Sequence, residues 1–137
     1  MQDVYRGPAM AAPPFDALYG LEIEAATAEE ARGAVPVSDG VRQPAGLVHA
    51  GVYAAMAESI CSAATWGAVH GDGMVAMGQS NSATFLRPIT EGHVNAVARP
   101  RHRGRTTWVW EVDITDDEGR LCALVRMTIA VREVTRR

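Results

Sequence analysis

The stretch that decides the fold reads GLVHAGVYAAMAESICSAATWGAV and spans residues 46–69. Alanine has the highest helix propensity and little bulk, so this run predicts one long helix that other segments can approach closely. Glu58 is the one carboxylate in the run, which contains no Lys or Arg. A carboxylate without a nearby cation on a helix this apolar is either a solvated side chain or a functional group.

The composition is that of a single globular domain. At 137 residues the chain is long enough for one hydrophobic core and too short for two domains. Its net charge of −3 gives no electrostatic footprint for nucleic acid or an anionic membrane, so neither partner is expected. All 13 basic residues are arginine, which excludes Schiff-base chemistry on lysine and leaves cations suited to bidentate contacts with phosphate or carboxylate.

The N-terminus and the cysteines carry no targeting or metal-binding signal. Residues 1–14 contain several prolines and predict a flexible arm, followed by one domain over residues 15–137. The arm lacks the basic-then-apolar pattern of a signal peptide, and no run reaches transmembrane length, so a cytoplasmic protein is expected. Cys61 and Cys122 lack CxxC spacing, which predicts buried, unbridged thiols and no metal site.

Two strand-like runs precede the helix and four follow it. Their apolar and polar residues alternate with the period of a strand that has one buried face. Strands are expected over residues 21–25, 31–37, 75–86, 93–102, 106–115 and 121–131. The first two predict a hairpin and the last four a meander, with a helical turn over residues 15–19 and the long helix ending near Gly71 or Gly73. One helix wrapped by a curved antiparallel sheet is an α+β arrangement, the hotdog fold.

The positions of Ala50 and Glu58 on the helix suggest a reaction centre. Ala50 lies in the first turn, where the backbone N–H groups have no intrahelical partner and can bind a carbonyl oxygen or an oxyanion. Glu58 lies eight residues later, about 12 Å along the axis, whereas a carboxylate and an oxyanion donor must both lie within a few ångströms of one reacting carbonyl. Two antiparallel helices related by a two-fold axis would satisfy both requirements, so the sequence predicts an obligate homodimer.

Each of these polar residues also has an ordinary structural interpretation. A helical glutamate such as Glu58 is usually solvated, and a histidine such as His49 before a helix usually caps or packs. Ser62, four residues after Glu58, can bond back to the helix backbone, and Gln43 in a proline-flanked loop is usually hydrated. The aromatic residues favour core packing over a ligand pocket; they are Trp66, Phe85, Trp108 and Trp110.

Residues 43–58, QPAGLVHAGVYAAMAE, resemble the start of the central helix in hotdog acyl-CoA thioesterases of the phenylacetate-pathway type. Within that group they are most similar to the 4-hydroxybenzoyl-CoA thioesterase branch, which uses a glutamate on this helix. The resemblance covers residues 15–132 and continues through MGQSN (77–81), FLRP (85–88), EGHV (91–94), TTWVW (106–110) and DDEGRLCA (116–123).

The resemblance implies hydrolysis of an acyl-CoA, with aromatic acyl groups favoured, and assigns roles by position. Glu58 would be the nucleophile or the general base, and the N–H of Ala50 would polarise the thioester carbonyl. Gln43 and His49 would shape and hold the thioester end, and Ser62 would assist the glutamate or its water from the partner subunit's helix.

The resemblance also implies how CoA is held and how the subunits assemble. Arg87, Arg105 and Thr106 would hold the nucleotide and phosphates of CoA, and Asn81 belongs to the same substrate-contacting set. CoA is part of the substrate, so no separate cofactor is expected. The family is typically a homotetramer built from dimers, in line with the predicted dimer.

Two departures from the family pattern leave the acyl group open. The family usually has two glycines after the histidine, and here the first is Ala50; a small hydroxyl residue usually follows Gly104, and here it is Arg105. Phenylacetyl, hydroxybenzoyl and dihydroxynaphthoyl groups all remain candidates. Two other functions remain as alternatives: a hotdog enoyl-CoA hydratase or dehydratase pairing His49 with Glu58, and a non-catalytic acyl- or aromatic-binding protein.

Overall fold

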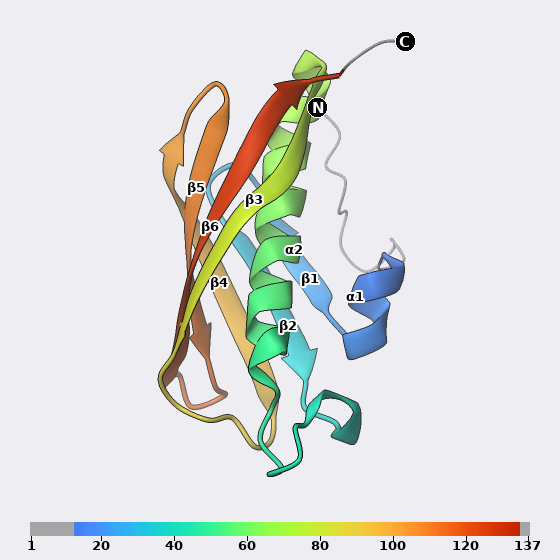
Figure 1. Ribbon diagram of the computed structural model, residues 1–137, viewed down its shortest axis with the longest axis vertical. Coiled ribbons are helices and arrows are strands. Elements are labelled where there is room, and N and C mark those ends of the chain that lie inside the picture. The colour runs from blue at the N-terminus through green and yellow to red at the C-terminus, as the bar shows by residue number, and fades with distance from the viewer. Residues whose placement is uncertain (1–12, 135–137) are drawn as a thin grey trace.

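The computed structural model describes residues 13–134, which form one long helix and a six-stranded antiparallel sheet (Figure 1). Helix α2 spans Ala50–Val69, and the curved sheet lies along it. His70–Asp72 adds a short 3-10 turn that ends at Gly73, close to the predicted end of the helix. The predicted α+β class and the hotdog arrangement are confirmed.

The strands follow the predicted ranges closely, but one of the predicted pairings is wrong. The strands are β1 (Glu22–Ala26), β2 (Ala31–Pro36), β3 (Met74–Phe85), β4 (His93–Arg103), β5 (Thr107–Thr115) and β6 (Leu121–Glu133), in the sheet order β1-β2-β4-β5-β6-β3. The last four strands therefore do not form a meander, because β3 pairs with β6 at the sheet edge while β4 pairs with β2. Consecutive strands are often neighbours, but long-range pairing decides the order, and local alternation cannot reveal it.

Helix α2 packs against the sheet through small and apolar side chains. Met56, Ala57 and Ile60 are fully buried, and the predicted core tryptophans of β5 are buried as well. The expectation of core packing is wrong for Phe85, which is 53% exposed because it lies at the end of edge strand β3. A buried polar link joins the two layers: the indole N–H of Trp110 donates to the hydroxyl of Thr65 (2.9 Å), which donates to a carbonyl one turn earlier in α2 (2.8 Å). Both groups are fully buried, so the link satisfies polar atoms that water cannot reach.

The two edges of the sheet differ in their protection. Edge strand β1 is short and carries two glutamates, whereas edge strand β3 has twelve residues with no charged side chain and no proline. Most of β3 is exposed on both faces, including about half of the Met77 side chain. Long, uncharged edges of this kind readily pair with another strand.

The short helix α1 (Pro14–Tyr19) confirms the helical turn expected before β1 and packs against α2. Most of the predicted N-terminal arm, residues 1–12, lies outside the described residues, and Pro13 is the N-cap of α1. Within residues 13–134, no helix is both long and apolar enough to cross a membrane.

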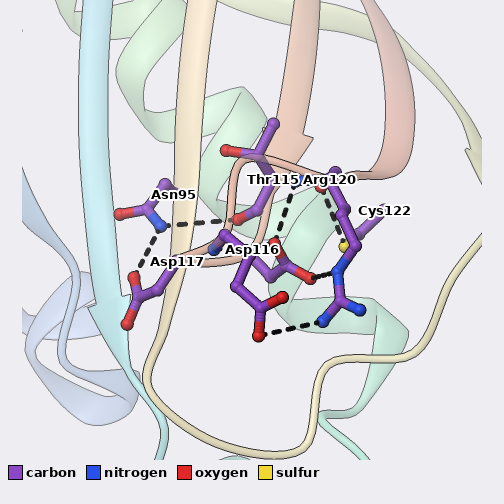
Figure 2. A network of polar contacts seen from close by, with 7 residues as sticks. Asn95, Thr115, Asp116, Asp117, Arg120 and Cys122 are labelled. Carbon is purple, nitrogen blue, oxygen red and sulfur yellow. Dashed lines mark hydrogen bonds and ion pairs between the residues drawn. The ribbon is translucent and has the colours of Figure 1, made fainter.

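The acidic turn predicted between the last two strands is confirmed, and its carboxylates organise a polar network (Figure 2). The buried carboxylate of Asp116 accepts from the backbone N–H groups of Glu118 (3.0 Å) and Arg120 (2.9 Å) and from the Arg120 guanidinium (2.7 Å). Burial alone would raise the pKa of Asp116, but these donors outweigh it and lower the pKa. Asp117 accepts from the Asn95 amide (3.0 Å), which lowers the pKa of Asp117.

Candidate active site

The start of α2 presents one free backbone donor. His49 is the N-cap residue, and its Nδ1 accepts from the N–H of Gly51 (2.8 Å). A Cβ at position 51 would lie 2.8 Å from that nitrogen, so glycine allows the imidazole to approach. The N–H of Ala50 has no acceptor within the helix, and no loop hydrogen bond of the described chain uses it. It is therefore available to a ligand, while the Nδ1 of His49 is occupied as a cap.

Gln43 lies in the loop that leads into the start of α2. The backbone of Gln43 donates to the carbonyl of Leu47 (2.8 Å), and its side-chain carbonyl accepts from the N–H of Ala45. No hydrogen bond among residues 13–134 uses the side-chain NH2 group of Gln43. The N–H of Val48 donates to the carbonyl of Ile89 (2.9 Å), which ties the loop to the β3–β4 connection. Gln43 thus keeps two donors near the positive end of α2.

Glu58 lies on the exposed side of α2 and lines a cavity of about 490 Å³. Strand β3 faces it, and a Cβ at Gly78 would lie 3.1 Å from the carboxyl carbon of Glu58. The side chain of Asn81 in β3 donates to the carbonyl of Ala54 (2.9 Å) and so fixes β3 against the helix. The lining residues are Phe15, Ala54, Ala55, Glu58, Ser59 and Asn81. No ion pair in the described part of the chain includes Glu58, so its carboxylate is free to act on a ligand.

The structure keeps the predicted oxyanion donor and the glutamate apart within one chain. Helix α2 is unbroken from Ala50 to Val69, so Ala50 and Glu58 remain about 12 Å apart along its axis. Ser62 is half-buried and does not line the cavity of its own chain. Ser59, which directly follows Glu58 on the same helix, does line it. Sequence reasoning missed Ser59 and Phe15, because nothing local shows that α1 folds back beside Glu58.

The predicted CoA-phosphate residues Arg87, Arg105 and Thr106 lie near opposite ends of strand β6. The N–H of Arg87 donates to the carbonyl of Cys122 at the start of β6 (3.1 Å), and the carbonyl of Thr106 accepts from the N–H of Val131 near its end (2.9 Å). Nine residues of strand separate these points by about 30 Å. Arg87 therefore lies near the start of α2, far from Arg105 and Thr106. Neither arginine has a carboxylate partner within residues 13–134, so both guanidinium groups are free to bind anions.

The cysteines are structural, as predicted. Cys61 and Cys122 are buried and unbridged, and burial raises the pKa of both thiols. A buried thiol that holds its proton is a poor nucleophile. In the part of the chain that the structure describes, no three His, Cys, Asp or Glu side chains are grouped to hold a metal ion.

Comparison with known proteins places this architecture in a family. The sequence pattern of the Thioesterase superfamily matches residues 45–123, more than half of the chain and including the start of α2 and Glu58. The chain belongs to the thioesterase superfamily. The family-level resemblance found in the sequence is thereby confirmed, and the protein is an enzyme of the thioester hydrolase class.

Individual relatives agree with this assignment to the thioesterase superfamily. Rv1847 of Mycobacterium tuberculosis, provisionally named an esterase, is 42% identical over 112 residues, covering 80% of each protein. The crystal structure of thioesterase HI1161 from Haemophilus influenzae, classed among the thioester hydrolases, has 34% identity and a TM-score of 0.83 over 89% of this chain and 85% of its own. SAV0944 from Staphylococcus aureus, with 27% identity and a TM-score of 0.83 over 88% of this chain and 99% of its own, was crystallised with a glutamate replaced by alanine. It was also crystallised with a glutamine replaced by alanine.

Proposed function

We propose that this protein is an acyl-CoA thioesterase that hydrolyses an acyl-CoA, with an aromatic acyl group favoured, to the free acid and CoA. The observation that carries the proposal is the carboxylate of Glu58, which is unpaired among the described residues and lies over a cavity on the helix whose first N–H is free. A free backbone donor polarises a carbonyl, and a free carboxylate attacks it or activates water. The family supports thioester hydrolysis in general; the resemblance to the 4-hydroxybenzoyl-CoA branch supports the aromatic acyl group.

The proposed reaction uses both groups on one thioester. The carbonyl oxygen accepts from the N–H of Ala50, and Glu58 of the partner subunit takes a proton from a water whose oxygen forms a bond to the carbonyl carbon. The oxyanion then collapses, the C–S bond breaks, and the CoA thiolate takes up a proton. In the nucleophilic form, Glu58 itself bonds to the carbonyl carbon, CoA leaves, and water hydrolyses the resulting anhydride.

Gln43, His49 and Ser62 are proposed to support this chemistry. The free NH2 group of Gln43 would donate to the thioester oxygen, and His49 would hold the helix start in place as its cap. The Staphylococcus aureus relative supports the pairing of Gln43 with Glu58, because its substituted glutamine and glutamate lie 15 positions apart, the same spacing as here. Ser62 would assist the glutamate or its water at the site shared with the partner.

A homodimer is the proposed minimal active unit. The distance of about 12 Å between Ala50 and Glu58 requires a second helix at each site. The uncharged edge of β3 supports dimerisation, because it offers twelve residues for pairing with a second copy beside α2. A homotetramer built from two such dimers follows from the resemblance.

CoA binding is proposed to use both ends of the sheet. Arg87 is near the start of α2, and Arg105 with Thr106 is near the other end of β6, so one chain does not gather them around one nucleotide. In an antiparallel dimer, the end of one subunit that carries Arg87 would lie beside the end of the other subunit that carries Arg105 and Thr106. These residues would then bind one CoA from two subunits. Asn81 would contact the substrate beside Glu58.

The test is replacement of Glu58 by glutamine with thiol release as the readout. We expect E58Q to lower kcat on aryl-CoA esters by about 10²–10⁴-fold, because the amide neither attacks nor accepts a proton, while KM changes little. Glu91→Gln, an exposed glutamate outside the cavity, is the matched control and should retain activity. Unchanged turnover in E58Q would refute the assignment.

The same assay separates the two alternatives. A hydratase would add water to a crotonyl-type CoA ester without releasing thiol, and it would need His49 as an acid or base. Because Nδ1 accepts from Gly51, the neutral imidazole carries its proton on Nε2, which argues against a role of His49 as the base. A binding protein would take up CoA esters without turnover in the wild type.

A further inference from the structure

A buried carboxylate, Asp16, is hydrogen-bonded to the cavity-lining Ser59 and takes no part in the proposed chemistry. It is 4% exposed and accepts from the hydroxyls of Ser59 (2.6 Å) and Tyr19 (3.1 Å). Burial raises the pKa of Tyr19, as do the nearby carboxylates, so the phenol keeps its proton as a donor. No arginine within the described chain pairs with Asp16, so these two hydroxyls are its side-chain partners.

The hydrogen bond between Ser59 and Asp16 connects α2 to α1 at a point where each residue is next to one that lines the cavity. On α2, Ser59 follows Glu58; on α1, Asp16 follows Phe15. Both Phe15 and Ser59 line the cavity that contains Glu58. The Phe15 ring packs edge-on against Tyr19, with centroids 5.5 Å apart, and the side chain is still 60% exposed. The contact to Asp16 thus fixes an aromatic side chain beside the candidate catalytic carboxylate.

The residues that line the cavity indicate which part of the substrate would lie against Phe15. Phe15, Ala54 and Ala55 provide apolar surface, and none of the six lining residues is an arginine. The phosphates of CoA require cations, which lie elsewhere at Arg87 and Arg105. The apolar portion of an acyl-CoA on the far side of the thioester is its acyl group, so the acyl group suits this cavity.

A buried carboxylate is also an unusual way to hold a short helix. An apolar residue would bury surface without desolvating a charge, whereas a hydrogen-bonded carboxylate holds its partners in one orientation. The Ser59 hydroxyl on α2 donates to Asp16 on α1, so this hydrogen bond restricts how α1 can lie against α2. Phe15 is the residue before Asp16 on α1 and lines the cavity.

We propose that Phe15 contacts the acyl group and determines which acyl groups are accepted, and that Asp16 is a positioning residue that holds Phe15 there through Ser59. The inference rests on the proposed thioesterase function and adds a specificity-determining wall to the same site. Leu18 on the same short helix is 82% exposed and does not line the cavity, so it provides a matched control.

The experiment compares F15A with L18A on a panel of alkyl- and aryl-CoA esters of increasing acyl size. F15A is expected to raise KM for the preferred ester by about tenfold or more, to change kcat much less, and to shift relative kcat/KM toward bulkier acyl groups. L18A is expected to keep the wild-type profile. An F15A profile identical to the wild type would overturn the proposal.

The positioning role of Asp16 is tested with D16A, S59A and D16N. D16A and S59A should reproduce the change in KM of F15A, whereas D16N keeps an oxygen acceptor for Ser59 and should restore most of the wild-type profile. A role in stability alone would lower the unfolding midpoint and leave the acyl preference unchanged. If D16A does not fold, S59A decides the same point, because Ser59 is half-buried and small.

Binding distinguishes a failure of this inference from a failure of the proposed function. Wild-type protein that releases thiol from no ester in the panel would remove the thioesterase proposal. Calorimetry with a non-hydrolysable aryl thioether of CoA would still compare wild type with F15A; weaker binding by F15A alone supports the wall, and equal binding overturns it.

Discussion

At the scale of single residues, the absence of a side chain at Gly78 sets where Glu58 can lie. A Cβ there would contact three atoms of the glutamate side chain at 3.1–3.3 Å. Gly78 has no positive φ, so its backbone does not require glycine. The requirement comes from the carboxylate on the neighbouring helix, and that makes Gly78 part of the site.

Gly78→Ala should therefore separate activity from stability. The added methyl displaces the Glu58 carboxylate by a few tenths of an ångström or rotates it, and we expect kcat to fall roughly tenfold. Alanine in a strand is as stable as glycine or slightly more so, so the free energy of unfolding should not fall. Thiol-release kinetics and urea unfolding check both expectations, with Ser82→Ala on the same strand as the control; equal kcat in G78A and wild type would contradict this role.

A substitution at Thr65, which lies in the core, should change stability and not activity. Thr65→Val keeps the shape but leaves the buried indole N–H of Trp110 without an acceptor, which should lower the free energy of unfolding by about 1–3 kcal/mol. Thr65→Ser keeps the hydroxyl and should cost less, despite the lost methyl group. Urea denaturation of the three proteins measures the difference, and a valine variant as stable as wild type would show that the bond contributes nothing net.

At the scale of elements, the turn between β5 and β6 makes stability depend on pH. The pKa of Asp116 is lower in the folded chain than in the unfolded one, because the donors of Arg120 and Glu118 favour the carboxylate. Its contribution to stability is therefore present above the unfolded pKa, about 4, and is lost as pH falls through the folded value. Asp117 acts in the same direction through Asn95.

Asp116→Asn should remove part of this dependence. The variant is expected to be less stable than wild type at neutral pH, and its unfolding midpoint should fall less steeply below pH about 4. Thermal unfolding measured across that range gives both slopes. Asp113→Asn, at an exposed position of β5, serves as the control. If the unfolding midpoint of D116N falls with pH as steeply as that of wild type, Asp116 does not contribute to the acid sensitivity.

At the scale of the whole molecule, the proposed dimer predicts that two inactive variants can restore activity to each other, which would not occur if each site lay within a single chain. If Gln43 of one subunit and Glu58 of the other serve one site, Q43A and E58A subunits that are each inactive will form one intact site in a mixed dimer. Random pairing makes half of the dimers mixed, with one of two sites intact, so about one quarter of wild-type activity should return.

The measurement is thiol release after the two variants are unfolded together and refolded, with each variant refolded alone as the control. Recovery near a quarter supports shared sites. No recovery, with mixed dimers demonstrated by differently tagged subunits, would show that both residues act within one chain.

The sequence by itself determined the local elements. The alanine-rich run from Ala50 to Val69, the alternation in five of the six strands and the acidic turn each depend on neighbours along the chain, and propensity and periodicity report on such neighbours. It also singled out Glu58 as a carboxylate without a local partner. The separation of Ala50 and Glu58 followed from helix geometry alone, and the structure preserves it.

Only the tertiary structure decided which distant segments meet. It placed β3 beside β6 instead of β4, brought α1 against α2 so that Phe15 and Ser59 line the cavity, and set Gly78 opposite Glu58. Arg87 and Arg105 were likewise separated by the length of β6. These contacts depend on strand pairing and helix packing between residues far apart in the chain, and neither periodicity nor propensity contains that information.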